Sequence, residues 1–194
     1  MQELAESRSK TGSRWHLRGQ FAAFLSHYKV EAAGDARQLK DKLTTKLGAP
    51  IFLDSDDLMD LRQLILQVTQ SDVLVLLQTR SLLTRPWCLI EIMTALKNDV
   101  PIVAVNVAGA FPYDFGDAQR LVDNFELELE ARNRGAGDVL RQQCGIDTAE
   151  LGRLLQESVP FIISKRYEPG ASQAVLDAQL EDIVQAMESS QKVL

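Results

Sequence analysis

The residues from Trp87 to Leu96 place a single carboxylate, Glu91, in a stretch that is otherwise uncharged and mostly apolar. Apolar side chains occupy eight of these ten positions, so no side of the helix that they predict is clearly polar. A helix that is apolar all round is a buried helix. An ionised carboxylate is costly to bury unless it is paired, hydrogen-bonded or protonated. We therefore expect Glu91 either to have a partner or to lie where the helix opens into a cleft.

Two interpretations of Glu91 remain open at this point. In the first, it is a core carboxylate paired with Arg80, Arg85 or a backbone amide. In the second, it is a catalytic group at a cleft, where perturbed titratable groups concentrate. The neighbouring Trp87 is likewise either a packing residue or a platform on which a ring stacks.

Apolar runs of strand length alternate along the chain with segments of helical periodicity. The runs predict strands at 21–25, 50–54, 73–77, 101–107 and 159–164. The periodic segments predict helices at 31–47, 61–70, 87–96, 117–132, 147–158 and 172–187. Strands of nearly continuous apolar residues between helices are typical of a parallel sheet covered on both faces. We predict an α/β fold, a flavodoxin-like doubly wound five-stranded parallel sheet of order 2-1-3-4-5.

In such a sheet a ligand binds outside the carboxyl ends of the strands, where the strand order reverses. For the order 2-1-3-4-5 this crevice lies between the first and third strands. The segments 26–34 and 78–86 then face each other across it, and the helix that carries Glu91 follows the second of them.

The composition excludes several classes of function. A formal net charge of −6 argues against nucleic acid as a main ligand, because phosphate binding needs a basic surface. No stretch approaches the roughly 18 apolar residues of a membrane helix, so we expect no membrane insertion. The glycine-rich motifs of dinucleotide and nucleoside triphosphate sites are absent. The two cysteines and two histidines show no metal-ligand spacing, so we expect no metal site.

These features indicate one domain over residues 19–188, with an extension or linker at 1–18 and a tail at 189–194. The sparse cysteines favour a reducing, cytoplasmic location.

Several of these segments resemble the Toll/interleukin-1 receptor (TIR) domain. Residues 24–28 resemble its first-strand box, and residues 51–54 with the acidic loop that follows resemble its second strand and long loop. The most specific part is the apolar strand at 73–77, then Ser81, then the Trp-Cys-x-x-Glu-Ile helix beginning at Trp87. The resemblance covers residues 19–107 well, and beyond them only the order of the elements supports it.

The resemblance implies that Glu91 is the catalytic glutamate of an NAD⁺-cleaving TIR domain. It also implies a substrate site formed by Ser26, His27, Tyr28, Lys29, Asp54, Ser81 and Trp87. The substrate would be NAD⁺ or NADP⁺, with no further cofactor, and the products nicotinamide and ADP-ribose or a cyclic relative. Self-association with other TIR domains, in immune or cell-death signalling, is implied as well.

The chain departs from the family pattern at two places. Ala22 stands where an acidic residue commonly opens the first strand, and residues 54–61 contain neither Pro nor Gly. Because that loop is the usual contact between protomers, the departure bears on how this chain would assemble.

Cleavage of the nicotinamide–ribose bond needs little machinery. The leaving group departs neutral from a cationic substrate, so no general acid is required, and one carboxylate stabilises the oxocarbenium-like ribose. Two other functions remain open: a TIR adaptor without catalytic activity, and a nucleoside deoxyribosyltransferase-like enzyme that acts on free nucleosides.

Overall fold

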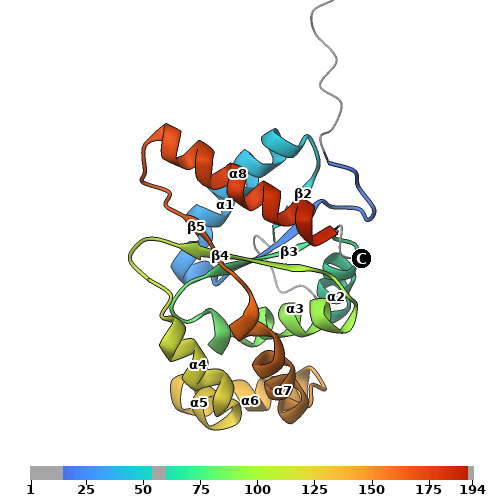
Figure 1. Cartoon of the computed structure of the whole chain (residues 1–194). Helices are drawn as coiled ribbons and strands as arrows, with labels where there is room; N and C mark the ends of the chain where they lie inside the picture. The colour runs from blue at the N-terminus through green and yellow to red at the C-terminus, as the bar shows by residue number, and fades with distance from the viewer. Residues whose placement is uncertain (1–14, 54–59, 192–194) are drawn as a thin grey trace, which may run out of the picture.

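The computed structural model describes residues 15–53 and 60–191. Its sheet has five parallel strands in the order β2-β1-β3-β4-β5, which confirms the predicted fold class and topology (Figure 1). The strands are β1 (Ala23–Ser26), β2 (Ile51–Leu53), β3 (Leu74–Gln78), β4 (Ile102–Val107) and β5 (Lys165–Tyr167).

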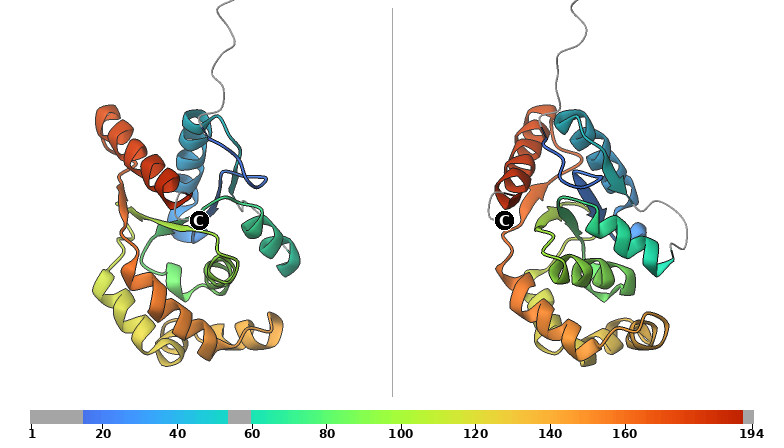
Figure 2. Two further views of the ribbon diagram at one scale, coloured as in Figure 1. Left: turned by 45° about the vertical axis from the view of Figure 1, so that its right-hand side comes forward. Right: turned by 90° about the vertical axis from the view of Figure 1, so that its right-hand side faces the viewer.

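Helices cover both faces of the sheet, as Figures 1 and 2 show. One face packs against α1 (Lys29–Leu47) and α8 (Gln173–Gln191), and the other against α2 (Leu61–Thr69) and α3 (Pro86–Lys97). Beyond α3 lies a further group of elements: α4 (Phe115–Asp123), α5 (Phe125–Arg132), α6 (Ala136–Asp138), a π-helical turn (Val139–Gln143) and α7 (Thr148–Ser158).

The alternation of side chains along the central strands explains why both faces are buried. In β1, Leu25 joins the core beneath α1 and α8, whereas Phe24 joins the core beneath α2 and α3. Val75 and Leu76 of β3 divide between the two cores in the same way. Every residue of both strands is buried, so the continuous apolar runs of the sequence are a direct consequence of this layering.

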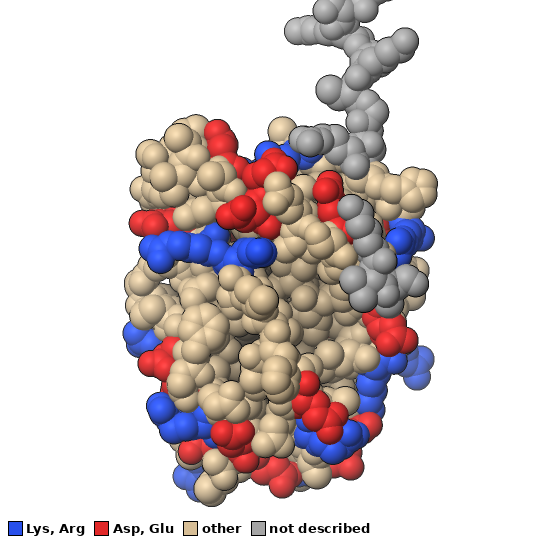
Figure 3. Space-filling view, in the orientation of Figure 1, with Lys and Arg blue, Asp and Glu red and all other residues tan. Residues whose placement is uncertain are grey.

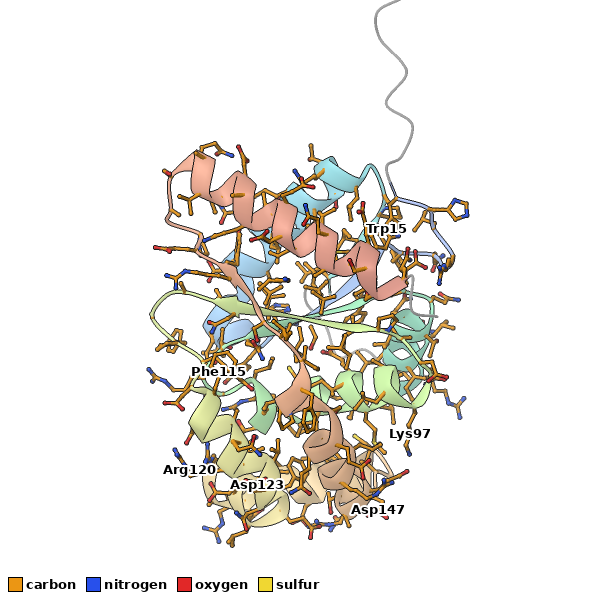
Figure 4. The ribbon with its side chains drawn as sticks, in the orientation of Figure 1. Trp15, Lys97, Phe115, Arg120, Asp123 and Asp147 are labelled. Carbon is orange, nitrogen blue, oxygen red and sulfur yellow. The ribbon has the colours of Figure 1, made fainter. Side chains whose placement is uncertain are left out.

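Two predicted helix ends are confirmed by their caps. Gly48 ends α1 in the left-handed conformation, with φ of 64°, and its N–H donates to the carbonyl of Thr44. Asp147 begins α7, because its carboxylate accepts hydrogen bonds from the backbone N–H groups of Ala149 and Glu150 (Figure 4).

The prediction of one helix over residues 117–132 is wrong. The backbone leaves the helical region at Asn124, with φ of −132° and ψ of 46°, so that α4 and α5 are separate helices. The break turns Phe125 into the core, where its side chain lies against Gly152 of α7.

The predicted strand at 159–164 is also wrong. Residues Val159–Phe161 form a 3₁₀ turn, and the fifth strand begins later, at Lys165. Pro160 has no N–H to donate to a neighbouring strand. Phe161 and Ile163 are 77% and 83% exposed, so their apolar character does not reflect burial.

The chain packs against the domain already at Trp15, four residues before the predicted start at residue 19. The indole Nε1 of Trp15 donates a hydrogen bond of 2.7 Å to Asp72, just ahead of β3. At the other end α8 continues to Gln191, whose carbonyl accepts from the Arg18 guanidinium. The segment before β1 and the end of α8 therefore meet (Figures 1 and 4).

Candidate active site

The candidate site lies at the carboxyl ends of β1 and β3, where the strand order reverses. β1 ends at Ser26, and residues 27 and 28 lead into α1. β3 ends at Gln78, and residues 79–85, which include the 3₁₀ turn Leu82–Thr84, lead into α3. The two connections lie at the end of the sheet for which the sequence predicts a binding crevice.

Glu91 lies in the second turn of α3 and is only 4% exposed. The helix around it is buried continuously from Cys88 to Ala95, which confirms the prediction of a helix apolar on all sides. The hydroxyl of Ser26, itself fully buried, donates a hydrogen bond of 2.5 Å to Oε2 of Glu91. The last residue of β1 therefore holds the carboxylate directly.

His27 is buried next to this pair. The pKa of His27 is lowered from 6.5 to about 4, mainly by burial, which a hydrogen bond to the Leu25 backbone opposes and the nearby charge of Lys29 assists. The imidazole is therefore neutral at pH 7. Its single N–H is the only proton that it could give to a leaving group.

Cys88 connects α3 to the same end of β1. Its thiol donates a hydrogen bond of 3.4 Å to the carbonyl of His27. Burial raises the pKa of the Cys88 thiol well above its usual value, and the negative charge of Glu91 raises it further. The thiol is therefore a packing group and not a nucleophile.

Four of the remaining predicted substrate residues lie at the edge of the candidate site: Trp87, Tyr28, Ser81 and Lys29. Trp87, in the first turn of α3, is 40% exposed and presents part of its indole to solvent. Tyr28, on the connection after β1, and Ser81, on the connection after β3, are half-buried, and Lys29 is exposed at the start of α1. Asp54 lies outside the described residues.

Two residues of the site were not predicted from the sequence as substrate-binding residues. The carboxylate of Glu31 accepts a hydrogen bond of 2.9 Å from the backbone N–H of Ser81, and so joins α1 to the segment after β3. The guanidinium of Arg85 lies over the Tyr28 ring, with Cζ 4.1 Å from the ring centroid. Both contacts join segments that are about 50 residues apart in the chain, and no local pattern signals them.

The described residues contain no group of three or more His, Cys, Asp or Glu side chains arranged to hold a metal ion. Within the same residues, no helix has the length and apolar content that a membrane crossing requires.

Comparisons with known proteins identify the fold. No protein-family model and no curated protein matches the chain. Among solved structures, the TIR domains of the activated Roq1 resistosome, which directly recognizes the pathogen effector XopQ, match with a TM-score of 0.57 and 16% sequence identity. The match covers 86% of this chain and 99% of that chain. The chain therefore has the fold of a TIR domain.

Proposed function

We propose that the protein is an NAD⁺ nucleosidase that cleaves the bond between nicotinamide and ribose. The observation that carries the proposal is the Glu91 carboxylate, buried at the switch point of the sheet and hydrogen-bonded to Ser26. A carboxylate in this position can stabilise the positive charge that develops on the ribose. Beside it lies the partly exposed indole of Trp87, on which the nicotinamide ring stacks in this proposal.

In the proposed reaction the C1′–N bond breaks and its electron pair leaves with nicotinamide, which departs neutral. Positive charge develops on the ribose, and the ionised Glu91 stabilises it at short range in a site of low dielectric. A water molecule then attacks C1′ and releases a proton, which gives ADP-ribose; attack by a group of the substrate itself gives a cyclic product.

Ser26 is a positioning residue in this proposal. Its hydroxyl occupies one carboxylate oxygen of Glu91 and fixes the orientation of the group. The neutral His27, the residues Tyr28, Lys29 and Ser81 at the edge of the site, and Asp54 would then contact the rest of the dinucleotide. NADP⁺ is the second substrate that we propose.

Replacement of Glu91 by Gln tests the proposal. The amide keeps the shape of the side chain but carries no charge, so we expect release of nicotinamide from NAD⁺ to fall by a factor of about 10² to 10³ or more. The measurement is nicotinamide formation over time, followed chromatographically. Glu150→Gln is the matched control, since Glu150 lies on α7 in a surface ion pair with Lys97 and should retain full activity.

Circular dichroism and thermal unfolding of both variants show that the fold is kept. Nicotinamide release by Glu91→Gln at the wild-type rate would refute the catalytic role of this carboxylate.

A second candidate is a non-catalytic TIR adaptor that acts through contacts between like domains. It is supported by the likeness of the fold to TIR domains of an assembled resistosome. The absence of NAD⁺ turnover at high protein concentration, even with crowding agents, together with self-association in sedimentation experiments, would favour the adaptor. Both candidates are compatible with a cytoplasmic role in immune or cell-death signalling, which we also propose.

A further inference from the structure

Arg85 is a half-buried cation immediately before α3, and its side chain lies beside Tyr28, which follows β1. Within residues 15–53 and 60–191, none of the ion pairs closer than 4.0 Å includes Arg85. Its Nε is buried and has no hydrogen-bond acceptor in the same part of the chain. A buried N–H donor without an acceptor is costly, and an anionic group of a ligand that reaches this atom would satisfy it.

The aromatic ring of Tyr28, which follows β1, contacts this guanidinium. The distance of 4.1 Å from Cζ to the ring centroid is that of a stacked cation–π contact. A guanidinium that lies over a ring can still donate hydrogen bonds to a phosphate through the N–H groups along its edge. The contact therefore positions Arg85 in advance of binding, because the rotamers of a long side chain are already restricted.

The place of Arg85 on α3 matches the charges of a nicotinamide nucleotide. Arg85 immediately precedes α3, whose N-terminal end carries a partial positive charge. Glu91 follows six residues later, a helical rise of about 9 Å. The substrate carries its positive charge on the nicotinamide ring and its nearest negative charge on the 5′-phosphate, with the ribose between them. One end of α3 thus offers an anion for the ring end and a cation for the phosphate end.

We propose that Arg85 binds the 5′-phosphate on the nicotinamide side of the substrate and makes nicotinamide nucleotides and dinucleotides preferred over the free nucleoside. The test of this proposal by turnover rests on the proposed nucleosidase function, whereas the test by binding does not.

Replacement of Arg85 by Gln, assayed with NAD⁺, nicotinamide mononucleotide and nicotinamide riboside, tests the proposal. We expect the KM for NAD⁺ and for the mononucleotide to rise by about ten- to hundredfold, the loss typical of a hydrogen bond to a charged group. The kinetics with the riboside, which has no phosphate, should not change. Arg80→Gln is the matched control, because Arg80 lies on the same segment but is exposed and packs over Phe111 at 5.8 Å.

Calorimetric titration of NAD⁺ into Glu91→Gln, and into the double variant that also carries Arg85→Gln, measures binding without turnover. Loss of affinity only in the double variant supports the proposal, even if the wild-type protein releases no nicotinamide and the nucleosidase function fails. Equal affinity of the two variants, or no NAD⁺ binding at all, overturns it.

Two kinetic outcomes also overturn the proposal while leaving the nucleosidase function intact. An equal loss with all three substrates would mean that Arg85 only supports the fold of the crevice. A loss confined to NADP⁺ would assign Arg85 to the 2′-phosphate on the adenosine side.

Discussion

At the scale of single residues, the site depends on how a carboxylate is kept inside a hydrophobic layer. Burial of Glu91 is opposed by desolvation, and the short hydrogen bond from Ser26 offsets part of that cost. Two neighbouring groups are uncharged at pH 7, since His27 is neutral and the Cys88 thiol stays protonated. Glu91 therefore has a hydrogen-bond donor, Ser26, and two uncharged neighbours, His27 and Cys88.

The depressed pKa of His27 predicts a pH-dependent stability. The unfolded chain binds a proton at His27 below about pH 6.5, but the folded chain does so only near pH 4. Folding is therefore progressively disfavoured as the pH falls from about 6.5 to 4, by roughly 3 kcal/mol in total for this group. In urea unfolding experiments at pH 7, 5.5 and 4, His27→Gln should lose less stability on acidification than the wild-type protein by about this amount.

His16→Gln is the control for this experiment, because His16 is exposed before β1. Parallel pH profiles for the wild-type protein and His27→Gln would show that the buried imidazole is not the group responsible.

At the scale of elements, the sheet is anchored at its far end by the segment before β1. The Asp72 carboxylate accepts hydrogen bonds from the Trp15 indole at 2.7 Å, from the Gly19 backbone N–H at 2.6 Å and from the Arg18 backbone N–H at 3.1 Å. Gly19 is required there, since a Cβ at this position would lie 2.3 Å from the carbonyl oxygen of Gln70. The anchor fixes the start of β3 relative to β1, and the crevice is formed at the other end of the same two strands.

Replacement of Asp72 by Asn should weaken this anchor. The amide oxygen accepts fewer and weaker hydrogen bonds than the carboxylate, so the free energy of unfolding should fall by about 2 kcal/mol. Urea unfolding followed by circular dichroism measures the change, and Asp41→Asn, at an exposed position of α1, is the control. A loss no larger than that of Asp41→Asn would mean that the hydrogen bonds to Asp72 contribute little to stability.

Most elements were predictable from the sequence because their signals are local. The apolar runs of β1 and β3 and the caps at Gly48 and Asp147 are properties of short segments. The break at Asn124 was not predictable, because it depends on Phe125 packing against α7, which is a tertiary contact. The start of β5 was misplaced because exposed apolar residues after Pro160 imitate a strand.

At the scale of the whole molecule, the difference between local sequence signals and tertiary contacts also explains what could be predicted of the candidate site. The parallel order of the strands is enough to bring Ser26 and Glu91 to the same end of the sheet, and both were predicted as site residues. The contacts of Glu31 and Arg85 depend on how side chains from two separate loops pack, so they required the structure. On the face seen in Figure 3, acidic and basic side chains are interspersed around a large area of uncharged ones, and nothing in the overall charge indicates the site.

The exposure of the site predicts how activity depends on assembly. Trp87 is 40% exposed, so a nicotinamide ring stacked on it would remain open to water on one side. A neighbouring protomer that covers this side would exclude water and strengthen the interaction of Glu91 with the ribose, because electrostatic interactions strengthen as water leaves. By mass action, nicotinamide release per mole of protein should then rise with protein concentration across a hundredfold dilution series, in step with the associated fraction measured by sedimentation. Strict proportionality between rate and concentration, while that fraction changes, would mean that a single chain forms the complete site.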